Sequence, residues 1–251
     1  MSQPLFDEAA RALRRQRALR KGPVLFLAER AVEDLQDRLS FIQRRFRRAL
    51  LIGLADASWT ERFSVSAEEL VSISNLEELV SVEPGSFDLC VVLGQLETTN
   101  ELPLFLRVIR ATLESNGLAV GAFPGNESLP VLRSVMLAAD QATGSGVSPR
   151  VHPRVEASAF AGLLQDAGFT MPVVDIDRVR LRYRRFDDLI RDLRGMGATN
   201  VLLSRAPRPL GRAALNAARQ AFAKLGDESG TMETVEIINF AAWTPASGES
   251  W

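Results

Sequence analysis

The chain of 251 residues contains one cysteine and one histidine, and these two scarcities limit its chemistry. The lone Cys90 excludes an intramolecular disulfide and a cage of thiolates around a metal ion. The lone His152 excludes a metal site with two histidines and leaves a single candidate for a histidine general base. We therefore predict no metal site and a narrow range of side-chain chemistry.

The sequence also lacks long apolar runs and an excess of charge of either sign. No uninterrupted apolar stretch approaches the roughly 20 residues needed to cross a bilayer, and none has the order of a signal peptide. The sequence accordingly predicts a cytoplasmic protein with no transmembrane segment. A formal net charge of −1 provides no long-range field for nucleic acid, so we expect no nucleic-acid partner.

The N-terminal segment is rich in arginine. Residues 1–20 place apolar side chains at helical spacing among these arginines, a pattern that fits a transit peptide, a membrane-surface helix or an ordinary first helix. Asp7 and Glu8 count against a transit peptide. We favour an ordinary helix whose arginine face is solvated.

A second helix is predicted from Leu25 toward Phe46, because apolar residues recur there every three or four positions. No linker rich in proline, glycine or serine divides the chain, so we expect a single structural domain overall. Within it, helices of residues 1–48 are predicted to pack on a core formed by residues 49–251.

Short apolar runs indicate buried strands. Ala49–Gly53 and Phe87–Leu93 are apolar almost throughout, which is typical of strands covered on both faces in a parallel sheet. A helix after Thr98 and a strand at Leu118–Phe123 follow with short connections, and such a unit demands a right-handed parallel crossover. The sequence therefore predicts an α/β fold with a doubly wound, mostly parallel sheet.

The second half of the chain is predicted to hold further helices, two strands and a long polar loop at 144–153 that has the length of a lid. Residues 173–183 alternate apolar with charged side chains, which indicates a half-exposed antiparallel strand. The other elements are helices at 127–140, before Gly168, at 186–194 and at 212–225, and a last strand at 235–243.

Several segments match the pattern of one family. They are Phe6-Asp7, Gly85–Leu89, Leu102-Pro103, Asn116–Leu118, Ser148–Val151, Leu163–Phe169 and Asp192–Asn200. With them the chain resembles the class I methyltransferase-like proteins that include the mitochondrial complex I assembly factor described as a protein arginine hydroxylase, and its bacterial relatives. Ser148–Val151 and Asp192–Gly197 are the most particular to that family. The resemblance implies a Rossmann-like class I methyltransferase fold for residues 49–251, with S-adenosylmethionine (SAM) as the cofactor.

In such folds a glycine-rich turn after the first strand lets the backbone approach the cofactor, and an acid after the second strand binds the ribose hydroxyls. The turn here begins with Gly53 but continues without a second glycine. It is either a degenerate SAM motif or a plain strand-to-helix connection. We predict cofactor-binding residues on this turn and after the strand that ends at residue 93. They are Gly53, Ala55, Asp56, Gly94, Gln95 and Leu96.

The stretch from Gly53 to Phe87 is short for a cofactor-binding half of such a sheet. Two helices and two strands of average length take about 32 residues before any loop is added. The ribose-binding acid is due about 20 residues after the glycine turn, where the sequence reads Ser72-Ile73-Ser74. We therefore predict that an element is missing or rudimentary. The nearest acids, none of which matches, are Glu68, Glu69, Glu77 and Glu78.

Two residues are candidates for catalysis. Glu97 follows the strand end at which an open parallel sheet places its ligands. His152 lies in the polar loop, where contact with a substrate competes with an ordinary surface position. Asp88, at the start of a strand, is expected to cap a turn rather than to act in catalysis.

Three functions stay open from the sequence. The first, which we favour, is a SAM-dependent methyltransferase or SAM-binding relative acting on a protein, in which alignment of donor and acceptor carries the reaction. The second is a catalytically inactive binding or assembly factor of the respiratory complex I type, with a partner-binding surface at Arg180–Asn200. The third is protein arginine hydroxylation, which only the resemblance implies and for which no protein ligand cluster is visible.

Overall fold

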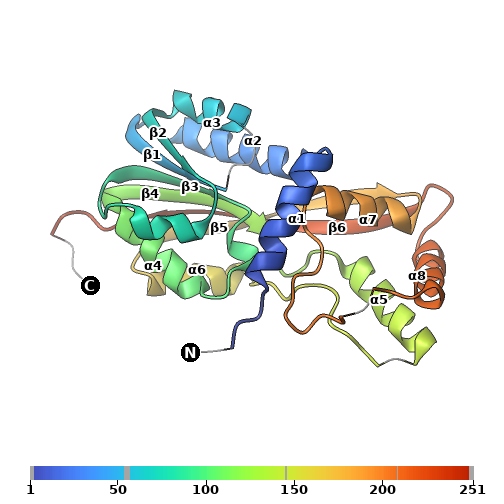
Figure 1. Cartoon of the computed structure of the whole chain (residues 1–251). Coiled ribbons are helices and arrows are strands. Elements are labelled where there is room, and N and C mark those ends of the chain that lie inside the picture. Colours follow the sequence, from blue (N-terminus) through green and yellow to red (C-terminus); the bar gives the residue numbers. More distant parts are fainter. Residues whose placement is uncertain (1–2, 54–56, 145, 208, 249–251) are drawn as a thin grey trace. The chain divides into compact units, whose positions relative to one another are not determined.

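The computed structural model describes residues 3–53, 57–144, 146–207 and 209–248, in which helices and strands alternate (Figure 1). The helices are α1 (Glu8–Lys21), α2 (Phe26–Phe41), α3 (Ala57–Arg62), α4 (Leu102–Thr112), α5 (Pro130–Thr143), α6 (Ala157–Asp166), α7 (Phe186–Gly195) and α8 (Arg212–Lys224). The strands are β1 (Phe46–Ile52), β2 (Ala67–Ile73), β3 (Phe87–Leu93), β4 (Leu113–Pro124), β5 (Thr170–Tyr183) and β6 (Thr231–Trp243). Short 3₁₀ helices are η1 (Phe63–Val65), η2 (Leu76–Ser81) and η3 (Leu96–Thr98). No helix within the described ranges has both the length and the apolar character needed to span a membrane.

The described strands form a six-stranded sheet in the order β2-β1-β3-β4-β6-β5. β1 pairs in parallel with β2 and with β3, and β3 pairs in parallel with β4. β6 runs antiparallel to β4, from Trp243 opposite Leu118 to Ile237 opposite Pro124. The structure thus confirms the predicted mostly parallel sheet with an antiparallel C-terminal part. It places the carboxyl ends of β1, β2 and β3 at one edge.

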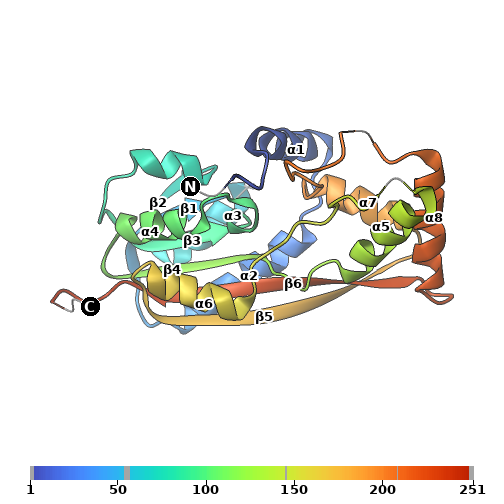
Figure 2. The ribbon, with the colours of Figure 1, turned by 90° about the horizontal axis from the view of Figure 1, so that it is seen from below.

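Burial along the strands follows from their places in the sheet. All residues of β3 are buried, as expected for a central strand covered on both faces. β5 alternates between more and less exposed side chains. It is the last strand in the sheet order, and Figure 2 shows it at the margin, beyond β6.

The start of β1 differs from the sequence prediction. α2 ends at Phe41, so the predicted continuation of that helix toward Phe46 was wrong, and β1 begins earlier than expected. The backbone N–H groups of Arg47 and Arg48 donate to the Asp88 carboxylate at 2.7 and 2.8 Å. Asp88 therefore fixes the arginine-rich segment as a strand, which is a structural role at the end of the sheet opposite to the ligand edge.

The start of α5 also differs from the prediction, because the residues before it bond to β6. Ser128 Oγ donates to the Glu236 carbonyl at 3.0 Å and accepts from the Glu236 N–H at 3.1 Å. The helix then begins at Pro130 instead of Glu127. The Glu233 carboxylate accepts hydrogen bonds from two N–H groups of the first helical turn, at 3.2 and 2.8 Å. A carboxylate is favourable at a helix N-terminus because of the partial positive charge there.

The stretch between Gly53 and Phe87 holds fewer elements than a complete half of a doubly wound sheet. Its described residues form the six-residue α3, the strand β2, and the 3₁₀ helices η1 and η2. Where a second helix and a second strand were due, the described residues provide only η2 and no further strand. This confirms the prediction that an element is missing or rudimentary.

The chain divides into two compact units, each built from three segments. Unit 1 comprises residues 1–25, 127–153 and 178–236, and unit 2 comprises residues 26–126, 154–177 and 237–251. α1 therefore belongs to unit 1 and α2 to unit 2. The domain limits expected from the sequence, 1–48 and 49–251, stay a prediction.

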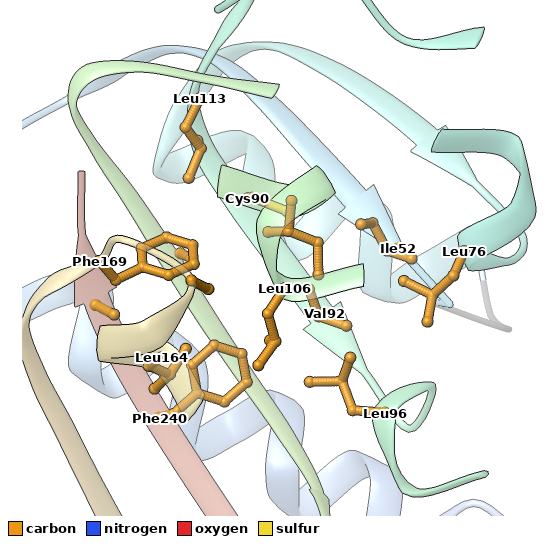
Figure 3. Packing of buried hydrophobic residues seen from close by; sticks show 14 of the residues in the cluster. Ile52, Leu76, Cys90, Val92, Leu96, Leu106, Leu113, Leu164, Phe169 and Phe240 are labelled. Carbon is orange, nitrogen blue, oxygen red and sulfur yellow. The ribbon is translucent and has the colours of Figure 1, made fainter. Parts of the chain in front are cut away.

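The core of unit 2 contains an aromatic cluster between β4, β6 and α6. Phe123, Phe160 and Phe240 meet with ring centroids 4.8 to 6.4 Å apart. Gly121 permits this approach, because a Cβ at that position would lie 2.5 Å from the Phe240 ring. Cys90 lies in the same core (Figure 3), where burial raises the pKa of its thiol and leaves it unreactive.

Candidate functional site

Two glycine turns leave the sheet at the carboxyl edge of unit 2. Gly53 follows β1 with a φ of +79°, and its N–H donates to the Ile73 carbonyl at 3.0 Å. Gly94 follows β3 with a φ of +57°, and its N–H donates to the Ala122 carbonyl at 2.9 Å. Glycine adopts positive φ without steric cost, which explains why glycine stands at both turns. Both turns lie at the strand ends where the sequence predicted them. The two other residues predicted on the first turn lie outside the described residues: Ala55 and Asp56.

Gln95 covers the bare Cα of Gly53. A Cβ added to Gly53 would lie 2.5 Å from Gln95 Nε2 and 2.5 Å from the Leu93 carbonyl oxygen. Gln95 is only 2% exposed, yet it is weakly held. Its Nε2 donates to the Ser74 carbonyl at 3.5 Å, and its Oε1 is buried with no hydrogen-bond partner among the described residues. Because an unsatisfied buried oxygen costs free energy, this side chain is only weakly anchored at the edge.

An acidic side chain that spacing along the chain did not identify reaches the end of β2. The Asn75 side chain accepts from the Glu78 N–H at 3.2 Å, and Glu78 Oε1 accepts from Asn75 Nδ2 at 2.9 Å and from the Ser74 N–H at 3.3 Å. These bonds form a variant of the capping box at the start of η2, in which Glu78 accepts from the residue before the N-cap and from the N-cap side chain. They fold the exposed Glu78 carboxylate back to the carboxyl end of β2. The Asn-x-x-Glu spacing is the sequence signal that predicts this placement.

The other predicted residues of this edge lie in η3. Leu96 is buried, and its side chain belongs to the core together with Ile52 and Leu76 (Figure 3). A ligand at the edge would therefore meet the backbone of Leu96. Glu97 follows, half-buried, just beyond the carboxyl end of β3. Across the described residues, no three His, Cys, Asp or Glu side chains gather as metal ligands.

His152 lies in unit 1, where it is buried and not on the surface of a loop. Its Nε2 accepts a hydrogen bond from the Val201 N–H at 2.8 Å, and its ring meets that of Phe6 edge-on at 5.6 Å. Acceptance at Nε2 requires the neutral ring to carry its proton on Nδ1. The structure thus gives His152 a packing role, and its part in catalysis stays a prediction.

The segments most particular to the resemblance come together in unit 1. One hydrogen bond connects the stretches around these segments, from Asn200 Nδ2 to the Pro149 carbonyl at 2.8 Å. Two more connect the N-terminal segment to the second stretch: Arg14 Nη1 to Thr199 Oγ1 at 2.9 Å, and the Asp7 N–H to the Val201 carbonyl at 2.8 Å. Two glycines allow close packing here. A Cβ on Gly195 would lie 2.5 Å from Val24 Cγ2, and one on Gly197 would lie 3.1 Å from Arg15 Cα. These motif residues therefore hold unit 1 together.

Asp140 anchors the loop that the sequence predicted as a lid. Its carboxylate pairs with Arg150 Nη2 at 2.6 Å and accepts from the Ser148 N–H at 3.0 Å. Burial raises the pKa of Asp140, but the hydrogen bonds from Arg150 and Ser148 outweigh it and hold that pKa below its ordinary value. Because the pKa of Asp140 is lower in the folded state than in the unfolded state, its ionised form stabilises the fold at pH values above its unfolded-state pKa of about 3.9. This stabilisation is lost as the pH falls through the pKa of the folded state.

We expect Asp140→Asn to lower the free energy of unfolding at pH 7 by about 2 kcal/mol, because the variant loses the charge-assisted bonds of a buried carboxylate. The difference from the wild type should shrink as the pH falls below about 4, where Asp140 also loses its charge. Urea unfolding at a series of pH values measures both. Asp166→Asn, on an exposed aspartate, is the control, and a difference that does not change with pH would contradict the assignment.

No family model matches the chain, but relatives and a solved structure do. It is 27% identical over 248 residues to "Arginine-hydroxylase NDUFAF5, mitochondrial" of Danio rerio, which is 90% of this chain and 77% of that protein. It is 28% identical over 174 residues to the malonyl-[acyl-carrier protein] O-methyltransferase of Laribacter hongkongensis, which is 69% of this chain and 56% of that protein. The solved 1,6-didemethyltoxoflavin-N1-methyltransferase of Burkholderia thailandensis superposes with a TM-score of 0.52 at 16% identity, over 97% of this chain and 93% of that one.

The chain is similar in sequence to class I methyltransferase-like proteins. This similarity bears out the resemblance, and the superposition confirms the fold that the resemblance implied. Across the curated relatives the matched part covers between 31% and 77% of the relative's own length. In a fold of this kind, the edge at Gly53, Glu78 and Gly94 is where an open parallel sheet binds its ligand.

Proposed function

We propose that this protein binds SAM at the carboxyl edge of β1, β2 and β3 and acts as a SAM-dependent methyltransferase on a protein. The proposal rests on the convergence of two glycine turns and one carboxylate at that edge. Gly53 and Gly94 bring bare backbone to the ligand, and Glu78 offers an acceptor for ribose hydroxyls. A protein substrate is supported by the Laribacter hongkongensis relative, whose name places the methylated group on an acyl-carrier protein.

The residues present fit the cofactor once the Gln95 side chain moves. The hydrogen bond from its Nε2 to the Ser74 carbonyl is long, at 3.5 Å, and Oε1 has no partner among the described residues, so displacement breaks no strong bond. When bound, SAM supplies a methyl group on a sulfonium, whose transfer depends mainly on alignment with the acceptor. The chain's own part is to hold that alignment, with Glu78 on the ribose side and Glu97 beyond the end of β3.

Calorimetric titration of the purified protein with SAM and with S-adenosylhomocysteine tests the proposal. We expect binding in the micromolar range and a rise in melting temperature, as mass action requires of a ligand that binds the native state. Absence of heat, together with an unchanged melting temperature at millimolar ligand, would overturn it.

Glu78→Gln is expected to weaken SAM binding about fivefold, because it removes the charge that strengthens hydrogen bonds from hydroxyl groups. Glutamine can keep the capping box, so the fold at η2 should persist. The same titration measures the change. Glu68→Gln, at the other end of β2, removes the same charge from an exposed side chain. Equal weakening in both variants would show a general charge effect and contradict a contact at Glu78.

A catalytically inactive binding or assembly factor is the second candidate, and the position of Gln95 favours it. With Gln95 over Gly53, the cofactor edge is closed by the chain's own side chain. Such a protein would work through a partner-binding surface, which the sequence places at Arg180–Asn200. An assembly factor of the respiratory complex I type is the form that the resemblance implies. Failure of the SAM titration would select this candidate. A cytoplasmic location stays a prediction of the sequence.

A further inference from the structure

The part of β5 that belongs to unit 1 carries arginines at every second position. Arg178, Arg180 and Arg182 are exposed, whereas Val179 and Leu181 between them are partly buried. Alternate side chains of a strand point to the same face. The three arginines therefore form a row with a spacing of about 7 Å, as the rise of an extended strand requires. We call this the arginine row.

The outer edge of β5 is open to pairing. β5 ends the sheet order, and no described strand pairs with its outer side (Figure 2). The strand is 14 residues long, whereas proteins usually keep edge strands short or distorted because unpaired N–H and C=O groups template another strand. A long, open edge of this kind suits an added strand from a partner.

The charge of the arginine row is only partly compensated within unit 1. Arg178 Nη2 lies 3.5 Å from Glu236 Oε2, and Arg182 Nη1 lies 3.2 Å from Asp227 Oδ1. Both arginines remain exposed, although the Glu236 carboxylate is buried. The Arg182–Asp227 pair is exposed on both sides, and such pairs are weak and readily exchanged. Arg180, between them, has no carboxylate at ion-pair distance in the described part of the chain. Within the described part of the chain the row therefore has one cation without an anion, Arg180, between two arginines that stay exposed beside their partners.

We propose that the outer edge of β5 binds an extended acidic segment of a partner protein by strand addition. Backbone hydrogen bonds provide the pairing, and alternate side chains provide the selectivity. Side chains of the added strand lie opposite the arginine row at one position and beside Val179 or Leu181 at the next. The fitting segment thus alternates Glu or Asp with aliphatic residues. A second copy of β5 fits poorly, because it would set arginine opposite arginine.

This inference deepens the second candidate function, because it names the chemistry of the partner, and it does not need a bound cofactor. The peptide and SAM titrations are separate measurements on separate units of the chain. A negative peptide titration leaves the SAM result standing, and a negative SAM titration leaves the peptide result standing.

The test uses the full chain and a fluorescein-labelled peptide of alternating glutamate and valine, with binding followed by fluorescence anisotropy. A peptide of the same composition with glutamates and valines in separate blocks, and one with lysine in place of glutamate, are the controls. We expect only the alternating acidic peptide to bind, with weaker binding at higher salt. Hydrogen exchange of the outward-facing amides among residues 178–183, every second one, should slow in the complex, because these amides gain backbone partners.

Arg180→Glu is expected to weaken binding of the alternating peptide about fivefold, since it replaces the least compensated cation of the row by an anion. Arg212→Glu, the same change on an exposed arginine of α8, should leave binding unchanged. An unfolding midpoint equal to that of the wild type verifies that Arg180→Glu has folded.

Equal binding of the block peptide, or binding without protection of the β5 amides, would reveal charge attraction alone and overturn strand addition. Absence of binding would overturn it too. Light scattering that shows a wild-type dimer, with the amides at 178–183 protected in it, would assign the edge to a second copy of the chain and would equally refute the proposal.

Discussion

The Phe160→Ala variant is expected to lose about 3 to 5 kcal/mol of its free energy of unfolding. Phe160 is fully buried on α6, and its ring centroid lies 4.8 Å from that of Phe123 and 5.2 Å from that of Phe240. Truncation removes the transfer free energy of the ring and leaves a cavity that the paired strands β4 and β6 cannot close. Urea unfolding followed by tryptophan fluorescence, to which the buried Trp59 of unit 2 contributes, measures the loss.

Phe41→Ala is the matched control, because Phe41 ends α2 and is 84% exposed. Removing the same atoms from the surface should change stability by no more than about 0.5 kcal/mol. Similar losses in the two variants, or a loss below about 1 kcal/mol for Phe160→Ala, would show that the aromatic cluster is not the centre of the unit 2 core.

The strands of this fold were predictable because apolar runs report burial directly. β3 occupies the residues that the sequence predicted, 87–93, since a central strand needs apolar side chains on both faces. The starts of β1 and α5 were not predictable in the same way. Asp88 and Glu236, distant in sequence, bond to the backbone or side chains at those positions. Local periodicity contains no record of such tertiary contacts.

The candidate site was predictable in place but not in packing. Gly53 and Gly94 lie at strand ends that topology brings to one edge. Glu78 was rejected on spacing, because counting along the chain ignores a capping box that folds the carboxylate back to β2. The direction of the Gln95 side chain depends on the space beside Gly53, which no sequence pattern reports.

The segments most particular to the resemblance prove to be packing residues of unit 1, whereas Gly85–Leu89, Leu102-Pro103, Asn116–Leu118 and Leu163–Phe169 lie in unit 2. Gly195 and Gly197 admit Val24 and the backbone of Arg15, and Asn200 fixes the Pro149 carbonyl. A resemblance carried by such residues is strong evidence for the fold, because close packing tolerates few substitutes. It is weak evidence for the chemistry, which depends on the separate edge of unit 2.

Gln95→Ala is expected to bind SAM about tenfold more tightly than the wild type, which corresponds to about 1.4 kcal/mol. In the wild type the ligand reaches Gly53 only in molecules whose Gln95 side chain has moved away, and this fraction lowers the apparent affinity. Alanine removes the Gln95 atoms that lie 2.5 and 2.6 Å from the added Cβ position, while the Leu93 carbonyl remains. Calorimetric titration of both proteins under the same conditions gives the ratio.

Gln165→Ala, which truncates an exposed glutamine of α6, should bind SAM as the wild type does. Tighter binding by Gln95→Ala, from a wild type that already binds, favours a methyltransferase with a partly covered site. Binding by the variant alone favours an inactive protein whose cofactor edge Gln95 has closed. Weaker binding by the variant would contradict the covering role. It would mean that the side-chain amide of Gln95 contacts SAM, and that the buried Gln95 Oε1 accepts a hydrogen bond from SAM when SAM is bound.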